Sequence, residues 1–168
     1  MNYRRVYVPG GTYFFTVVTH NRIPIFSDPS VVETLRMAFK YTLAHHPFTI
    51  VANVILPDHI HAVWTLPEDN SDFSTRWRLI KSHFTQNWTN RHKDVSVWQH
   101  RFWEHLIRNG EDLTRHVEYI HYNPVKHGLA LSPSTWPFSS FSKFVSAGLY
   151  PESWGSNEKI WEGEKLME

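Results

Sequence analysis

Residues 48–66 decide how this chain folds, and they read FTIVANVILPDHIHAVWTL. Apolar, β-branched and aromatic residues fill both halves of the stretch, and Pro57-Asp58 interrupts it near the middle. Two such runs joined by a short turn are typical of a β-hairpin. We therefore expect an antiparallel pair of strands over residues 48–56 and 59–66.

Upstream of this hairpin the sequence predicts one strand and one helix. Residues 11–19 are rich in β-branched and aromatic side chains and follow the turn signal Pro9-Gly10-Gly11, which is the pattern of a strand. The triplet Asp28-Pro29-Ser30 has the chemistry of a helix start. Apolar residues then recur at helical spacing as far as His45, so we expect a helix there.

Three further elements are expected downstream of the hairpin. Residues 72–91 show the apolar spacing of an amphipathic helix, and residues 97–107 alternate as a strand would. A short helix is expected over residues 111–122, because Pro124 disfavours helical geometry at Asn123. The order β-α-β-β-α-β-α predicts an α+β fold, a ferredoxin-like antiparallel sheet with helices packed on one face.

Length and charge predict one domain followed by a short tail. A chain of 168 residues, 41% of them hydrophobic, is the size of a single packed domain. Residues 1–150 contain 15 Lys and Arg against 11 Asp and Glu, a net charge of +4, whereas residues 151–168 contain two Lys against five Glu, a net charge of −3. We expect a mildly basic domain over residues 1–150 and an acidic C-terminal tail over residues 151–168.

Composition also predicts the compartment. The chain has no cysteine, which excludes disulfides and thiolate metal sites, and a reducing environment poses no difficulty for it. Residues 1–10 lack the apolar stretch of a signal peptide, and no apolar run in the sequence reaches membrane-spanning length. Cytoplasmic localisation is therefore the expectation.

His59 and His61 stand at i and i+2 on the second strand of the predicted hairpin. Side chains alternate along a strand, so both imidazoles share one face while Ile60 points the other way into the core. Two neutral imidazoles on one face can chelate a divalent cation. The same spacing is common in proteins without a metal, so it leaves a structural role for the pair open.

Tyr119 and Asn123 lie four residues apart on the last predicted helix, and therefore on one helical face. A phenol titrates near pH 10 and is a poor nucleophile at neutral pH unless a metal or a base assists it. In phosphoryl transfer a bound cation supplies that help, and His59, His61 and the Asn123 side-chain oxygen would leave coordination positions for substrate. Nitrogen-rich ligation favours Mn²⁺ over Mg²⁺ in affinity. Tyr122 is the rival nucleophile, but it does not share a helical face with Asn123.

Motifs spread over roughly residues 3–145 resemble those of one family. They are Tyr3-Arg4-Arg5, Pro9-Gly10-Gly11-Thr12-Tyr13-Phe14, Leu56-Pro57-Asp58-His59-Ile60-His61, residues 98–108, residues 118–129 and Trp136-Pro137-Phe138-Ser139-Ser140-Phe141. Jointly they resemble the REP-associated tyrosine transposases, members of the HUH superfamily of single-strand transposases, which is named for two His flanking a hydrophobic residue. By that resemblance His59 and His61 are metal ligands. Tyr119 is then the nucleophile and Asn123 the third ligand.

The resemblance implies an enzyme that cleaves and rejoins single-stranded DNA. Residues 1–150 would form its catalytic and DNA-binding domain. Attack by Tyr119 would leave a 5′-phosphotyrosine and a free 3′-hydroxyl, and another 3′-hydroxyl would reseal the strand without a nucleotide cofactor. The implied cofactor is a divalent metal, Mg²⁺ or Mn²⁺. The implied partners are single-stranded DNA hairpins of the repetitive extragenic palindrome (REP) type. A monomer is expected, with a dimer as the alternative.

Basic residues interleaved with aromatic rings can neutralise phosphates and stack unpaired bases. The predicted DNA-binding residues are Tyr3, Arg4, Arg5, Arg76, Arg78, Lys81 and Arg91. Two other functions stay open at this point. One is a non-catalytic hairpin-binding protein on the same fold. The other is a metal-dependent hydrolase that uses water, in which Tyr119 has a structural role.

Overall fold

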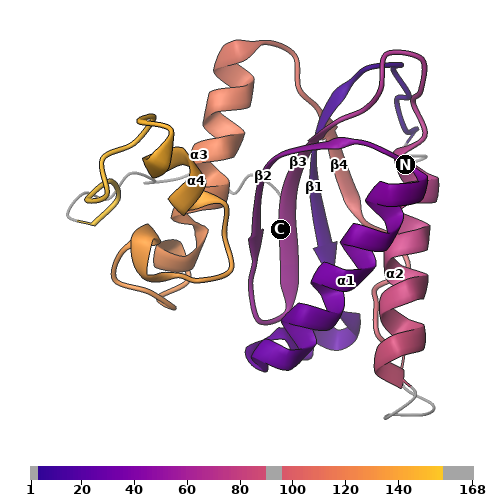
Figure 1. The fold of residues 1–168 in the computed structure, drawn as a ribbon, viewed down its shortest axis with the longest axis horizontal. Helices are drawn as coiled ribbons and strands as arrows, with labels where there is room; N and C mark the ends of the chain where they lie inside the picture. The colour runs from indigo at the N-terminus through magenta and orange to yellow at the C-terminus, as the bar shows by residue number, and fades with distance from the viewer. Residues whose placement is uncertain (1–3, 90–95, 157–168) are drawn as a thin grey trace.

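A four-stranded antiparallel sheet forms the centre of the molecule, with strand order β2-β3-β1-β4 (Figure 1). The computed structural model describes residues 4–89 and 96–156. The strands are β1 (Thr12–Val18), β2 (Thr49–Ile55), β3 (His59–Thr65) and β4 (Trp103–Leu106). The predicted hairpin is confirmed, because β2 and β3 pair antiparallel with Ile55 opposite Ile60.

Two helices cover one face of the sheet. They are α1 (Pro29–His45) and α2 (Phe73–Thr89), which pack against each other over the larger hydrophobic core. In this core Trp64 of β3 stacks on Trp77 of α2, with 4.3 Å between ring centroids. The Asp28 carboxylate caps α1 by accepting a hydrogen bond from Ser30 N, as the sequence predicted. The expected α+β fold, antiparallel sheet and helical layer are therefore confirmed.

The third long helix, α3 (Gly110–Lys126), lies on the opposite face of the sheet (Figure 1). Its Ile120 packs with Phe14 of β1 and Val54 of β2 in a second hydrophobic core. The sequence predicted helices on one face, and α3 adds a layer on the other. The sheet itself explains this layer, because both of its faces are apolar. The consecutive residues Phe14 and Phe15 of β1, for example, point into different cores on opposite faces.

α3 also extends further than the sequence predicts. Its expected end is Tyr122, whereas the helix continues through Pro124 to Lys126. A proline inside a helix costs about 3 kcal/mol because it removes a backbone hydrogen bond and crowds the preceding turn. Burial offsets this cost, since every side chain from Tyr119 to Pro124 is buried. As a result Asn123 and Lys126 stay on the same helix as Tyr119.

β4 is much shorter than the strand predicted over residues 97–107. The residues that pair with β1 are Trp103–Leu106, while Trp98 forms a single bridge with Thr19. Aromatic burial explains the misleading pattern. Trp98 and Phe102 pack on the larger core from irregular backbone, so their apolar character reflects the core and not a strand.

A 3-10 turn over Pro133–Thr135 and α4 (Phe141–Ser146) follow α3. The residues between them reach the edge of β2, where Ser139 forms a bridge with Val54. The packed part of the chain continues to at least Ser156, whose hydroxyl hydrogen-bonds the Ser132 hydroxyl at 3.0 Å. The rest of the predicted acidic tail, residues 157–168, lies outside the described residues. Among the described helices, none combines the length and the apolar character needed to cross a membrane.

Candidate active site

The two histidines of the predicted pair lie side by side on β3 and face α3. His59 and His61 are 3% and 0% exposed, and their ring centroids are 4.8 Å apart. Ile60 between them belongs to the core on the other face, beneath α1 and α2. Alternation along the strand therefore puts both imidazoles on one face, as the sequence predicted.

Hydrogen bonds orient both rings. The Asp58 carboxylate accepts from His59 Nδ1 at 2.6 Å, and His61 Nδ1 is 2.9 Å from the Thr16 hydroxyl oxygen. An ionised carboxylate can only accept, so His59 carries its proton on Nδ1 and presents a lone pair on Nε2. Arg22 donates to Asp58 from the other side at 3.1 Å. Partners of this kind fix the tautomer and orientation of histidines that bind metals.

Burial keeps both imidazoles neutral. It lowers the pKa of His59, although the hydrogen bond to Asp58 opposes the shift. It lowers the pKa of His61 further, and nearby positive charges, including that of Lys126, act in the same direction. A neutral imidazole is the form that binds a metal. The pair is therefore in its ligand form at neutral pH.

The structure brings Tyr119 next to this pair. Its ring lies 5.4 Å from that of His61, edge to face, although one residue comes from α3 and the other from β3. Phe14 of β1 lies beneath the phenol, at 6.1 Å between centroids. The rival Tyr122 instead contacts Trp154 of the C-terminal segment, at 6.4 Å. Of the two tyrosines, Tyr119 is the one on the α3 face that meets the histidines.

Asn123 lies on the same face of α3, one helical turn beyond Tyr119. The turn after it carries His127, whose ring is 5.4 Å from that of His59. Asn123 is thus placed between two residues that contact the histidine pair. Its side chain is 0% exposed, and within the described residues neither atom of its amide has a hydrogen-bond partner.

Unpartnered buried atoms are available to a cation here. Within the part of the chain that the structure describes, His59 Nε2, His61 Nε2 and Asn123 Oδ1 are buried without a hydrogen-bond partner. A buried polar atom left unpaired costs about 1–3 kcal/mol, so each of these three requires an explanation. Imidazole nitrogens and an amide oxygen are ligands that divalent ions such as Mn²⁺ accept. The donor set therefore suits the metal expected from the sequence.

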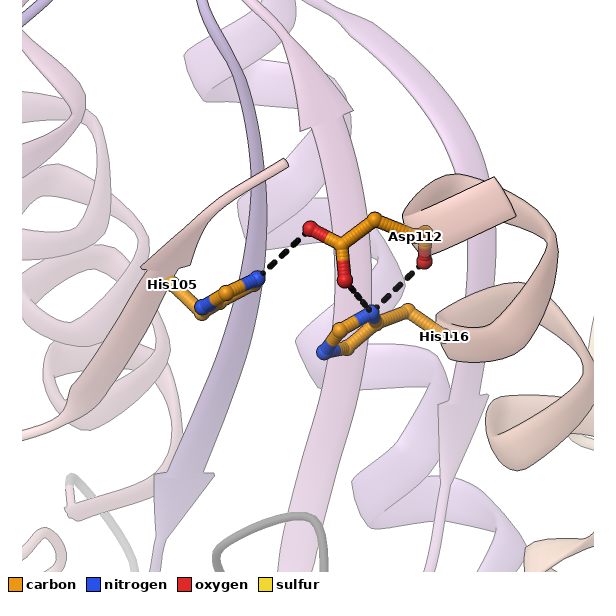
Figure 2. A group of neighbouring side chains, drawn as sticks. All are labelled: His105, Asp112 and His116. Carbon is orange, nitrogen blue, oxygen red and sulfur yellow. Dashed lines mark hydrogen bonds and ion pairs between the residues drawn. The ribbon is translucent and has the colours of Figure 1, made fainter. Parts of the chain in front are cut away.

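Figure 2 shows a second group of potential ligands, His105, Asp112 and His116. Phe14 separates this group from the histidine pair, because its ring lies 5.5 Å from that of His61 and 4.9 Å from that of His116. The donor atoms of the group lie within 4.8 Å of one another, but they already bond to each other. Asp112 Oδ2 accepts from His105 Nε2 at 2.8 Å and from Arg108 Nε at 3.2 Å. His116 Nδ1 donates to the Asp112 carbonyl oxygen at 2.7 Å. Burial raises the pKa of Asp112, but hydrogen bonds from Arg108 and His105 outweigh burial and hold that pKa well below its ordinary value.

This bonding assigns the second group a structural role. Asp112 lies in the first turn of α3 and His105 lies on β4, so their hydrogen bond joins the helix to the sheet. A cation at this place would have to displace hydrogen bonds and share the carboxylate with Arg108. His59, His61 and Asn123, whose donor atoms lack partners among the described residues, are therefore the better candidate ligands.

Lys126 is a residue of the site that the sequence analysis did not single out. Its Nζ donates a hydrogen bond to the Tyr119 hydroxyl at 3.1 Å and lies 4.7 Å from the centroid of the phenol ring. The two residues are seven positions apart, which is two helical turns. That spacing predicts contact only if the helix continues past Pro124, whereas the helix predicted from the sequence ends at Tyr122.

Two of the predicted DNA-binding residues are exposed, namely Arg4 and Arg78. Arg5 and Lys81 are partly buried around the Phe102 ring, at 4.1 and 5.3 Å from its centroid. Burial, aided by the charge of Arg5, lowers the pKa of Lys81 to about 8. Arg4 and Arg78 are thus the more accessible to a phosphate.

Arg76 is a structural residue. It is 3% exposed, and its guanidinium donates to the carbonyl oxygens of Pro47 and Asp72 at 2.9 and 2.7 Å. Its contact with DNA stays a prediction, although these N–H groups bond to backbone carbonyl oxygens and connect α2 to the chain before β2. The other two predicted contacts, Tyr3 and Arg91, lie outside the described residues.

Comparison with known proteins agrees with this geometry. A family model described as IS200-like transposases matches residues 7–123, a range that contains the histidine pair, Tyr119 and Asn123. The chain therefore belongs to the IS200-like transposases. This transposase is 47% identical to the REP-associated tyrosine transposase of Escherichia coli K12, over 98% of each chain. It is 43% identical to a Haemophilus influenzae relative of the same type, over 95% of this chain and 96% of the relative.

A solved structure is similar over the whole length of this transposase. It is described as the REP-associated tyrosine transposase bound to a REP hairpin, with 46% identity and a TM-score of 0.85. The match covers 100% of this chain and 99% of that chain. These relatives place this transposase among the REP-associated tyrosine transposases, in agreement with the motifs.

Proposed function

We propose that this transposase cleaves and rejoins single-stranded DNA at REP-type hairpins through a covalent 5′-phosphotyrosine on Tyr119. The observation that carries the proposal is the 5.4 Å contact between the rings of Tyr119 and His61. The contact lies where Nε2 atoms of both histidines are buried without a partner among the described residues. A nucleophile and a candidate cation site thus share one small region.

His59, His61 and Asn123 are the residues that would hold a divalent ion, Mg²⁺ or Mn²⁺. Such an ion, when bound, supplies positive charge to the non-bridging oxygens of the scissile phosphate. Burial lowers the pKa of both histidines and so favours the neutral form that binds a metal. Asp58 also holds His59 in the tautomer whose Nε2 is free to bind.

Tyr119 supplies the nucleophile in this proposal. Its hydroxyl oxygen attacks the phosphorus and loses its proton, and the bond from phosphorus to the 3′-oxygen breaks. The products are a 5′-phosphotyrosine and a strand that ends in a 3′-hydroxyl. Lys126 Nζ, at 3.1 Å, aligns the phenol and places a positive charge beside the attacking oxygen. Attack of a 3′-hydroxyl on the phosphotyrosine reverses the step, so cleavage and joining use the same groups.

The proposed substrate rests on relationship and charge. The solved relative that covers this whole chain is described as bound to a REP hairpin. Residues 1–150 carry a net charge of +4, from 15 Lys and Arg against 11 Asp and Glu. We propose that the exposed Arg4 and Arg78 contact phosphates. The partly buried Arg5 and Lys81 add positive charge next to them. The nucleophile and the three proposed ligands come from one chain, which supports activity as a monomer.

A labelled hairpin with a single-stranded flank tests the proposal. With Mg²⁺ or Mn²⁺, the wild type is expected to form a protein–DNA adduct that survives denaturing electrophoresis and is absent in Tyr119→Phe. Tyr122→Phe is the matched control and is expected to keep the adduct. Hairpin binding without an adduct in the wild type would support the non-catalytic alternative. Cleavage that persists in Tyr119→Phe would support hydrolysis by water.

A further inference from the structure

A cavity of about 500 Å³ opens at the outer edge of β2. Figure 1 shows β2 as the edge strand, with α4 beyond it and α1 crossing the sheet. The cavity is lined by side chains from α1, from β2 and from residues 138–149, and we name it the β2-edge cavity. Ligand sites in proteins have volumes of about 300–1,000 Å³, so the cavity is large enough for a small molecule that contains a planar ring. None of its lining residues belongs to the proposed metal and nucleophile site.

Three aromatic rings stand in the walls of the cavity, those of Phe39, Phe138 and Phe144. Phe39 and Phe138 are half-buried on the core beneath α1 and α2, and Phe144 is half-buried on the core beneath α3. The cavity is therefore the place where the two cores meet at the open edge of the sheet. Each ring keeps part of its surface exposed, and aromatic surfaces of this kind can stack on a planar ligand, although Phe144 also stacks on Tyr150 at 5.7 Å between centroids.

Backbone groups are also available there. Residues 138–140 cover the edge of β2 further along, where Ile55 N donates to Phe138 O at 2.8 Å and Ser140 N donates to Asn53 O at 2.9 Å. Before Asn53, the β2 residues Ile50 and Val51 line the cavity instead. An edge strand presents its outer N–H and C=O groups to whatever lies beside it, which suits the donors and acceptors on the rim of a planar ligand.

The mouth of the cavity is basic. Arg36, Lys40 and Lys143 line it and are exposed, and none of the described residues that line it is acidic. The guanidinium of Arg36 lies 5.6 Å from the centroid of Phe138, so a cation and a ring are presented together. Glu33 pairs with Arg36 at 3.6 Å, but both side chains are about half exposed and such pairs contribute little. The surface therefore complements a ligand that combines a flat apolar part with negative charge.

We propose that the β2-edge cavity binds an unpaired nucleotide of the DNA strand, with its base among Phe39, Phe138 and Phe144 and its phosphates against Lys40 and Lys143. Stacking rings next to cations are the combination with which proteins bind single strands. Asn53 and Ile55 line the cavity and flank Val54 on β2, and Val54 pairs with His61 of β3, so the cavity and the histidine pair lie on adjacent strands of the sheet. The inference rests on the proposed function, since it takes single-stranded DNA as the substrate.

An abasic scan tests the proposal. Hairpins with a single-stranded flank are made with one base removed at each flank position in turn, and their affinity for the full-length protein is measured by fluorescence anisotropy. In the wild type, one position is expected to lose about tenfold in affinity when its base is removed. Ala147→Trp, which fills the cavity without changing its charge, is expected to bind the intact flank about tenfold more weakly and to be insensitive to base removal at that position. Ala44→Trp, an exposed α1 residue outside the cavity, is the matched control and should behave as wild type.

A charge variant gives an independent reading. Lys143→Ala is expected to reduce the slope of log affinity against log salt by about 0.7 for the flanked hairpin and to leave a hairpin without a flank unchanged. Identical abasic scans in wild type and Ala147→Trp, together with an unchanged salt slope in Lys143→Ala, would overturn the proposal and point to a peptide strand as the occupant. A wild type that binds no hairpin at all would overturn the proposed function itself, and this inference with it.

Discussion

Lys126 Nζ and the Tyr119 hydroxyl lie 3.1 Å apart across two turns of α3. Tyr119 is 1% exposed and Lys126 is exposed, so the lysine stands between the phenol and solvent. Pro124 lies between them in the sequence, and the contact exists because the helix continues through it. The end of α3 therefore carries both the proposed nucleophile and the charge that aligns it.

Replacement of Lys126 is expected to slow the chemical step. Lys126→Met keeps the length of the side chain and removes its charge and hydrogen bond, so adduct formation at saturating DNA should fall about 10-fold to 100-fold, as expected for a hydrogen bond to a charged group of about 1.5–3 kcal/mol. Hairpin affinity should stay close to wild type. Lys126→Arg should recover part of the rate. Equal rates in all three proteins would show that the contact has no part in the reaction.

Metal binding is expected to depend on the histidine pair and not on the second histidine group. Calorimetric titration with Mn²⁺ should show an affinity for His61→Ala that is lower by more than about 100-fold, because changes to residues behind a ligand alone cost about 10-fold to 100-fold. His105→Ala, the matched control from the group in Figure 2, should bind Mn²⁺ as wild type does. The reverse result would move the metal to His105, Asp112 and His116.

Arg76 and Arg78 lie two positions apart on α2, and their replacement by alanine should have different effects. Arg78 is exposed, so Arg78→Ala should weaken hairpin binding and lower its salt slope by about 0.7–0.9, the contribution of one phosphate contact. Arg76 is buried and bonded to backbone carbonyl oxygens, so Arg76→Ala should leave DNA binding alone and lower the free energy of unfolding by about 2–3 kcal/mol. Urea denaturation and anisotropy titrations of both variants measure the two effects. A DNA-binding defect confined to Arg76→Ala would contradict this assignment.

Acid should destabilise the metal-free protein through its buried imidazoles. Burial lowers the pKa of His59, His61, His116 and His121, the last to about 4. The unfolded chain takes up these protons below about pH 6.5 while the folded chain does not, so the free energy of unfolding should fall as pH drops from 6.5 toward 4. For His121 alone this amounts to about 3 kcal/mol.

Urea denaturation of wild type and His121→Leu between pH 7 and 4, with a chelator present, measures this dependence. The stability of His121→Leu should fall less steeply with acid than that of wild type, because the group that resists protonation is gone. Parallel profiles would mean that His121 takes up its proton at the same pH in the folded and in the unfolded protein.

The local patterns of the sequence predicted most of the fold. Asp28-Pro29-Ser30 marked the start of α1, and the two runs around Pro57-Asp58 gave the hairpin with both histidines on one face. The length of α3 and the short length of β4 were not predicted, because both depend on tertiary packing. Burial of Tyr119 to Pro124 outweighs the cost of proline and prolongs α3, and the aromatic residues near Trp98 serve the core from irregular backbone.

The placement of the candidate site residues was predictable where it depends on the periodicity of a single strand or helix. His59 and His61 followed from strand alternation, and Tyr119 with Asn123 followed from helical spacing. That these pairs meet was implied by the family resemblance and by no pattern in the chain. The contact of Lys126 with Tyr119 and the burial of Arg76 need the folded structure, because charge and spacing alone do not separate a buried arginine from an exposed one.

Peptide mapping of the trapped protein–DNA adduct tests the central claim most directly. After reaction with a labelled hairpin and Mn²⁺, nuclease and protease digestion should leave a nucleotide on one peptide, which mass spectrometry can sequence. The expected site is the Tyr119 oxygen, linked to a 5′-phosphate. A nucleotide on Tyr122, or strand cleavage with no nucleotide on any peptide, would contradict the account.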